Sequence, residues 1–127
     1  MATRTISDAG GNYNAVGAWV EGVVPTASDA VVATATSGQL TVNVTSVALS
    51  VNFTNYTNTL TMNHTLTVSG NVTLVSAMTI TTSSGTPLLT INATATLTSN
   101  TKTWAYALTF NTNTGTRRTR IGRINWI

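Results

Sequence analysis

Apolar and polar residues alternate through the middle of the chain, and the polar position is usually threonine. Apolar–threonine–apolar triplets occupy residues 40–42, 60–62, 66–68, 72–74, 78–80, 89–91, 95–97 and 108–110, and the four central ones recur at a spacing of six. Successive side chains of a β-strand point to opposite faces, so both apolar residues of a triplet share one face and the threonine points away. The pattern therefore predicts short strands with one buried face, and almost no helix.

Very short turns, such as residues 69–71, separate the predicted strands. Short strands at even spacing cannot each hold a core, and they are typical of either a β-solenoid or a β-sandwich. We favour an all-β fold built as a short parallel β-solenoid (β-helix), wound right-handed with roughly twenty residues per coil and about four coils. A β-sandwich or jelly roll is the alternative. In the solenoid, the apolar residues of 66–68 and 72–74 can all face inward only if the chain bends between them.

The sequence divides into three segments. Residues 1–29 form a predicted N-terminal cap, 30–110 form the threonine-rich β body, and 111–127 form a basic and apolar C-terminal segment. A solenoid needs a cap because the first coil leaves backbone groups unpaired. We expect Trp19 and residues 25–29 to supply it, with the indole covering the first coil. A tryptophan simply buried in a single core is an equally good interpretation.

Charge is confined to the two ends of the sequence. The 72 residues from Ala30 to Thr101 contain no Asp, Glu, Lys or Arg. All three acids lie within the first 29 residues, and five of the six bases lie at or beyond Lys102. The chain has no cysteine, which excludes disulfides and thiolate metal sites. This distribution argues against enzymes and favours a structural or interaction protein.

The few groups able to do chemistry are isolated from one another. His64 is the single histidine and has no acid within thirty residues, so a turn or surface histidine is a better interpretation than a general base. Asp8, Glu21 and Asp29 could pair as glycosidase carboxylates or bind calcium, but they lie in the predicted cap and no loop concentrates them. We therefore expect no catalytic residues, no cofactor and no metal.

Six Asn-x-Thr sequons occur, at Asn43, Asn52, Asn55, Asn63, Asn71 and Asn92. In a secreted eukaryotic or archaeal protein they would be glycan acceptors on surface turns. A chain with 29 threonines produces several such matches by chance, and we prefer that explanation.

An arginine cluster followed by apolar residues is the sharpest feature outside the β body. The residues that we expect to bind a partner are Arg117, Arg118, Arg120, Arg123, Ile124 and Trp126. Guanidinium groups make bidentate bonds to carboxylates, and apolar neighbours supply the buried area of a protein interface. The alternatives are a phosphate-binding patch with aromatic residues stacking on bases, and a solvated tail with no partner.

The N-terminal region also resembles a known group of proteins. The resemblance is carried by the runs Gly11-Asn12-Tyr13-Asn14-Ala15, Trp19-Val20-Glu21-Gly22-Val23-Val24-Pro25-Thr26 and Asp29-Ala30-Val31-Val32. They are similar to the opening of β-helical surface proteins from structural genes of tailed phages and of threonine-rich bacterial adhesins. Later Leu-Thr-Val phrases fit the same group, so the resemblance covers about residues 10–80. It implies a virion surface or fibre component, in a group whose members are often much longer.

We therefore expect a non-enzymatic structural protein on the virion surface, most specifically a capsid decoration protein or a short head fibre. Its expected partner is a capsid or other virion structural protein, and a homo-oligomer is expected, with a trimer as one option. No window approaches the roughly 18 apolar residues of a membrane span, so no membrane partner is expected. Nucleic acid is not an expected partner either.

Two other functions stay open, and both allow an extracellular or cell-surface location. A receptor- or glycan-binding tail-fibre or adhesin module would gather exposed aromatic residues on one face. The candidates for that face are Tyr13, Tyr56, Trp104 and Tyr106. A self-polymerising extracellular filament would instead use residues 121–127 as a terminal strand that completes the sheet of the next subunit.

Overall fold

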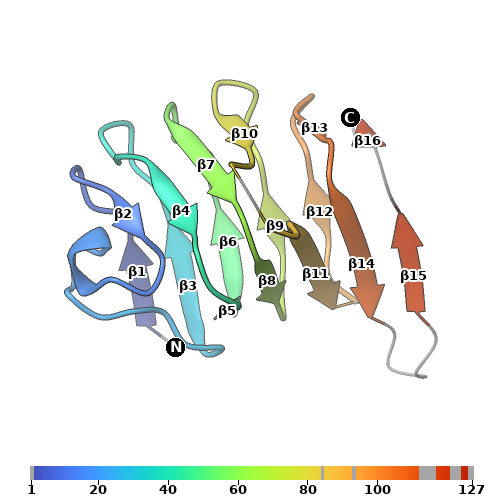
Figure 1. The fold of residues 1–127 in the computed structure, drawn as a ribbon, viewed down its shortest axis with the longest axis horizontal. Coiled ribbons are helices and arrows are strands. Elements are labelled where there is room, and N and C mark those ends of the chain that lie inside the picture. The colour runs from blue at the N-terminus through green and yellow to red at the C-terminus, as the bar shows by residue number, and fades with distance from the viewer. Residues whose placement is uncertain (1, 84, 93, 112–116, 121–123, 126–127) are drawn as a thin grey trace.

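Three parallel sheets wrap around one core in the computed structural model of the chain (Figure 1). The structure describes residues 2–83, 85–92, 94–111, 117–120 and 124–125, and from residue 111 onward it describes the backbone alone. The only helical element within these ranges is a short 3-10 segment, η1 (Val16–Ala18). The predicted all-β solenoid is confirmed, and the sandwich alternative is wrong.

Each sheet collects one strand from every coil. Sheet 1 contains β1 (Ala2–Thr5), β3 (Asp29–Val32), β6 (Ser50–Asn52), β9 (Val72–Thr73) and β12 (Leu97–Thr98). Sheet 2 contains β2 (Gly11–Asn12), β4 (Leu40–Val42), β7 (Thr59–Met62) and β10 (Thr79–Thr81). Sheet 3 contains β5 (Ser46–Ala48), β8 (Thr65–Val68), β11 (Leu88–Asn92), β14 (Ala107–Asn111) and β15 (Arg117–Arg120).

The chain changes direction only at its C-terminal end. β15 pairs antiparallel with β14, and β16 (Ile124–Asn125) pairs antiparallel with β13 (Thr103–Trp104). All other strand pairs are parallel. In Figure 1 the chain rises through sheet 1 at the back and descends at the front while it advances from left to right, which is a right-handed winding.

The register explains the six-residue spacing of the triplets. Leu40 pairs with Leu60 and Leu60 with Ile80, so one coil takes twenty residues in this part of the chain. The triplets that begin at Leu60, Leu66 and Val72 instead lie in three different sheets. A spacing of six residues therefore marks consecutive sides of one coil rather than consecutive coils.

The core is a set of stacked apolar side chains that point inward from the three sheets. Leu66, Val68, Val72 and Leu74 are each at most 3% exposed. The chain leaves sheet 3 after Val68 and enters sheet 1 at Val72, because it bends at residues 69–71. The condition set by the sequence is therefore met, because all four residues face inward and a bend separates the two triplets.

Threonine ladders cover the outside of the same strands. The registers align Thr41 with Thr61 and Thr81 in sheet 2, and Thr67 with Thr90 and Thr109 in sheet 3. Every ladder threonine follows or precedes an inward-facing apolar residue, as the alternation requires. Four of these threonines are half-buried and offer hydroxyl groups on the sides of the rod, whereas Thr61 and Thr109 are buried.

One buried tyrosine fixes the turn between sheets 1 and 2. The hydroxyl of Tyr56, which is fully buried, accepts a hydrogen bond from the Leu40 N–H at 3.1 Å. It lies 2.7 Å from the Gly38 carbonyl oxygen and 2.8 Å from that of Thr59, to which it can donate. Burial raises the pKa of Tyr56 to about 12, so the phenol stays protonated and able to donate.

Candidate functional site

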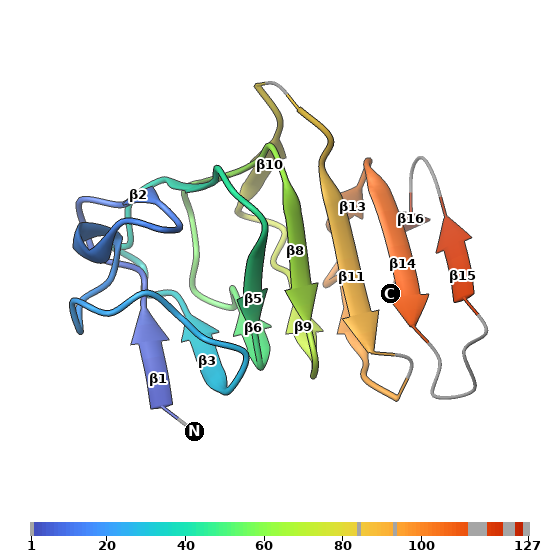
Figure 2. The same cartoon turned by 60° about the horizontal axis from the view of Figure 1, so that its bottom comes forward.

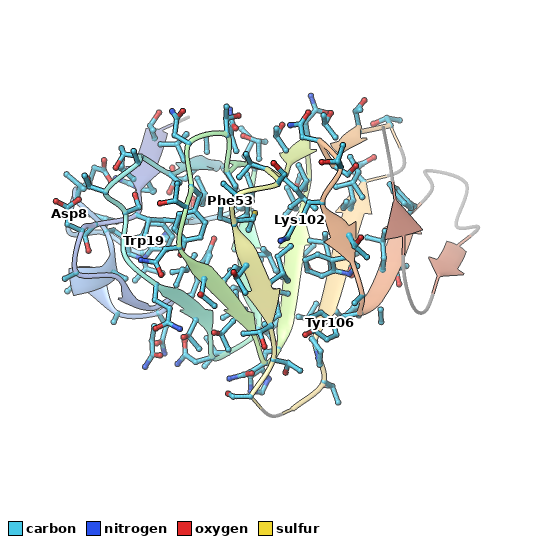
Figure 3. The ribbon with its side chains drawn as sticks, turned by 90° about the horizontal axis from the view of Figure 1, so that it is seen from above. Asp8, Trp19, Phe53, Lys102 and Tyr106 are labelled. Carbon is cyan, nitrogen blue, oxygen red and sulfur yellow. The ribbon has the colours of Figure 1, made fainter. Side chains whose placement is uncertain are left out.

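The N-terminal end of the solenoid is closed by an aromatic cap. Trp19 is 2% exposed, and its ring meets that of Tyr13 edge to face, with centroids 5.0 Å apart. The Trp19 Nε1–H donates to the Tyr13 carbonyl oxygen at 3.0 Å, and the Tyr13 hydroxyl donates to the Val47 carbonyl oxygen at 2.7 Å. Val47 belongs to β5, the first strand of sheet 3. Trp19 therefore acts as the cap that the sequence predicts, and Figure 3 shows it near the N-terminal end.

The cap also blocks the free edge of β1. The Val20 N–H donates to the Thr5 carbonyl oxygen at 2.8 Å, and the Thr5 N–H donates to Glu21 Oε1 at 2.7 Å. An open strand edge offers unpaired donors and acceptors to other chains. Burial works against ionisation of Glu21, but the hydrogen bonds to its carboxylate, with those from Thr5 foremost, and the nearby Arg4 guanidinium together outweigh it and hold the pKa of this carboxyl below its usual value. Glu21 is thus a structural acceptor in this fold.

Asp29 is likewise held by structural contacts. Its Oδ2 accepts from the Thr26 N–H at 2.9 Å and from the Arg4 Nε–H at 3.2 Å. The bond from the Thr26 backbone and the nearby Arg4 guanidinium keep the pKa of Asp29 below its ordinary value. This cluster ties β1 to the turn before β3, which is the start of the first complete coil.

The lowered pKa of Asp29 predicts acid sensitivity of the cap. A carboxyl whose pKa is lower in the folded state stabilises the fold above its unfolded pKa of about 4, and this stabilisation is lost as the pH falls towards the folded value. We expect the free energy of unfolding to fall between about pH 5 and pH 3. In Asp29→Asn, which keeps an oxygen acceptor, this fall should be smaller, as measured by urea unfolding at several pH values. An unchanged pH dependence in the variant would contradict the assignment.

The remaining polar candidates are not brought together. Asp8 is exposed and its Oδ1 accepts from the Thr36 hydroxyl at 2.7 Å, while His64 is exposed on the turn between β7 and β8. Among the described residues, no three His, Cys, Asp or Glu side chains are grouped so that they could hold a metal ion. Each of the three acids thus has its own hydrogen-bond donors, although the Arg4 guanidinium lies near both Glu21 and Asp29.

The aromatic residues proposed for a receptor face are mostly inside the protein. Tyr13, Tyr56 and Trp104 are at most 2% exposed, and Tyr106 is half-buried with its ring 6.1 Å from that of Trp104. The prediction of an exposed aromatic cluster is wrong for these residues. The reason is that each large ring fills a coil interior or an end of the core, where the apolar area that it removes from water is greatest.

The predicted partner-binding residues lie at the opposite end of the rod. Arg117, Arg118 and Arg120 belong to β15, the C-terminal edge strand of sheet 3, and Ile124 belongs to β16 (Figures 1 and 2). Arg123 and Trp126 lie outside the described residues, as does the region 121–123 between the two strands. Backbone pairing to β14 and β13 brings both strands to the last coil.

Winding converts the charge pattern of the sequence into a charge pattern along the rod. Strand order in sheet 1 follows sequence order, so position in the chain sets position along the axis. The cap end carries Arg4 and the three acids, and among the described residues the last coil and its return strands carry Lys102, Arg117, Arg118 and Arg120. The coils between them are uncharged. The two ends are therefore the candidate interaction surfaces.

No family model, no curated protein and no solved structure matches this chain. The solenoid geometry and the chemistry of its ends are accordingly the basis for assigning a function. No helix among the described residues is long and apolar enough to cross a bilayer.

Several sequons lie at positions where the asparagine side chain holds a turn. Asn43 donates through Nδ2 to Asn14 Oδ1 at 3.0 Å, and the Oδ1 of Asn71 accepts from the Thr96 N–H at 2.8 Å. The Oδ1 of Asn63 accepts from the Ser83 N–H at 2.9 Å. These contacts give the asparagines a structural role at the corners of coils.

Sequence reasoning missed two components of the cap. The sequence does not show that Tyr13 packs on Trp19, nor that Glu21 accepts a hydrogen bond from the edge of β1. The adjacent glycines Gly10 and Gly11 indicate that the backbone of the cap passes close to another backbone segment. Gly10 has a φ of +64°, and a Cβ there would overlap the backbone of Gln39.

Proposed function

We propose that the chain is a non-enzymatic structural protein of the virion surface, of the capsid decoration or short head-fibre kind. The basic C-terminal end attaches to an acidic surface of a capsid or other virion protein, and the threonine-covered coils project away from it. The residues that make the attachment are Arg117, Arg118, Arg120, Arg123, Ile124 and Trp126.

The observation that carries this proposal is the charge-free, hydroxyl-covered rod with charge only at its ends. Half-buried ladder threonines such as Thr67 and Thr90 give the sheet surface hydroxyl groups without fixed charge. A rod of this kind has no electrostatic preference for lateral partners, whereas each end has a definite sign. Attachment through an end suits a protein that stands on a larger assembly.

The contacts of the acids support the non-enzymatic part of the proposal. Glu21 caps the edge of β1, Asp29 binds Arg4 and Thr26, and Asp8 binds Thr36. General acid–base catalysis needs such groups within hydrogen-bond reach of a shared reacting atom. Here each carboxylate serves a different contact in the cap.

The virion part of the proposal rests on the resemblance of residues 11–32 to β-helical phage and adhesin proteins. In this chain those residues include Tyr13 and Trp19, whose rings cover the first coil, and Asp29, which anchors it to β1. The similar motif therefore corresponds to a defined structural unit, the cap of a solenoid.

The test is binding of the purified chain to phage heads assembled without it. Wild-type chain should co-sediment with the heads and raise their resistance to heat or urea, because a ligand that binds only the intact shell stabilises it. A variant with all four arginines at 117, 118, 120 and 123 changed to glutamine should lose most of this binding. The matched control is Asp8→Asn with Glu21→Gln, which removes charge at the other end and should bind to the heads as the wild type does.

Unchanged binding of the arginine variant would overturn the assignment of the attachment end. If the chain instead binds added nucleic acid, and this binding weakens steeply as the salt concentration rises, the phosphate-binding alternative is favoured.

A further inference from the structure

We infer that copies of this chain associate head to tail, with the basic end of one copy seated on the N-terminal cap of the next. This contact uses the same basic end as the proposed attachment, and so it rests on that assignment of the end. It adds a second surface, the cap, and it names the partner, which is a second copy of the chain.

The cap carries apolar side chains that the fold leaves uncovered. Among the described residues, the large apolar side chains that are exposed all lie on the cap and the first coil. They are Val16, Val20, Val23, Val44 and Val47, with exposed fractions from 37% to 65%. Exposed apolar residues that cluster in one region, rather than scatter singly, indicate an interaction surface.

Contacts within the protein bring these valines into one region. The bond from Asn43 to Asn14 places the turn that carries Val44 beside the segment that leads into η1 and Val16. The bond from Tyr13 to the Val47 carbonyl ties the start of sheet 3 to the same segment. The apolar residues thus lie on the cap and on the coil next to it, where Val47 is aligned with Thr67 and faces the side of the rod.

The same region carries negative charge that is not neutralised within the cap. Arg4 pairs with the buried Asp29, which leaves Asp8 and Glu21 as the exposed carboxylates. Each of these uses one oxygen for an internal bond, from Thr36 and from Thr5 respectively. A second charged partner can still approach both groups from solvent.

The last coil has the complementary properties. Two apolar residues of this coil that pack against the core, Tyr106 and Phe110, are only partly buried. The strand β15, with three arginines in four residues, forms the edge of sheet 3 at this end (Figure 2). An acidic apolar cap and a basic apolar last coil therefore match in both charge and hydrophobicity.

The uncharged coils explain why the contact is axial. Residues 30–101 offer no charge that could direct side-by-side packing, so the electrostatic attraction between two copies is strongest end to end. A head-to-tail contact between identical subunits is heterologous, and it extends into a filament unless it closes into a ring. The contact differs from exchange of a terminal strand, because β16 pairs with β13 of its own chain.

The experiment is sedimentation velocity of the purified full chain over a range of protein and salt concentrations, with no particle protein present. The wild type should form species larger than a monomer as the concentration rises, and added salt should shift them towards monomer because it screens the charges. A neutral-cap variant, Asp8→Asn with Glu21→Gln, keeps both internal acceptors and should need at least a tenfold higher concentration to associate.

A charge-swap pair tests the geometry directly. One variant carries Asp8→Lys with Glu21→Lys, and the other carries glutamate in place of all four arginines at 117, 118, 120 and 123, which leaves Lys102 as the one base at that end. Each alone has two ends of the same sign and should stay monomeric, whereas an equal mixture should regain association because each cap then meets an end of opposite sign. Circular dichroism of each variant checks that the sheet fold is kept.

A wild type that stays monomeric throughout the concentration range would overturn the inference, and so would association that persists in the neutral-cap variant. Failure of the mixed charge-swap pair to associate would overturn it as well. Binding to phage heads is measured separately, so such a result leaves the proposed attachment standing, whereas loss of attachment alone leaves the head-to-tail contact standing.

Discussion

Replacing Trp19 with alanine is expected to destabilise the chain by about 3–5 kcal/mol, the range found when a large buried aromatic side chain is removed. The indole is 2% exposed, packs edge to face on Tyr13 and donates to the Tyr13 carbonyl oxygen. Its loss leaves a cavity at the end of the core and an unpaired carbonyl group, and it loosens the segment that blocks the edge of β1. Urea unfolding followed by circular dichroism measures the change.

The matched control for Trp19 is its neighbour Val20, whose side chain is 65% exposed. Val20→Ala keeps the backbone bond to Thr5 and should change the free energy of unfolding by less than about 0.5 kcal/mol. If the two variants were equally stable, the capping role of the indole would be refuted. The tryptophan variant should also associate more readily through the edge of β1, because fraying of the cap exposes that edge.

Replacing Leu66 with alanine is expected to cost about 2–4 kcal/mol, whereas Thr67→Ala should cost well under about 1 kcal/mol. Leu66 is 3% exposed and is aligned in the core with Leu89 in the next coil. Thr67 lies next to it in the chain but points outward in the ladder with Thr90. The cavity left by leucine cannot be filled by neighbours that are held in register from both sides, whereas water replaces the threonine hydroxyl.

Thermal and urea unfolding of the two variants would be compared under identical conditions. Equal losses of stability from Leu66→Ala and Thr67→Ala would show that the faces of β8 are assigned wrongly. Because the two residues are adjacent in one strand, their position in the coil cannot account for a large gap between them, and the higher strand propensity of threonine would act in the opposite direction.

Local alternation was enough to predict which side chains face inward. The orientation of Leu66, Val68, Val72 and Leu74 follows from the two-residue period of a strand and the bend between the triplets. The coil length of twenty residues was also predictable, because the turns between triplets are too short to allow many other arrangements. These features depend on residues close together in the sequence.

Roles that depend on distant contacts could not be predicted. Tyr13 is an exposed aromatic candidate under the receptor-binding alternative, but its hydroxyl reaches the carbonyl of Val47, 34 positions along the chain. The bond between Glu21 and the backbone of Thr5 likewise requires the cap to fold back on β1. No local pattern distinguishes a buried tyrosine from an exposed one when its partner comes from another coil.

The sequence by itself determined an all-β chain of short strands, an uncharged threonine-rich body and the confinement of charge to the two ends of the chain. The tertiary structure decided where these charges lie in space. Because the coils stack in sequence order, charges that are separated along the chain become separated along the axis of a rod, with Glu21 at one end and β15 at the other. Alternation sets the faces of strands through local geometry, whereas the surfaces at the ends arise only when winding brings segments from different coils together.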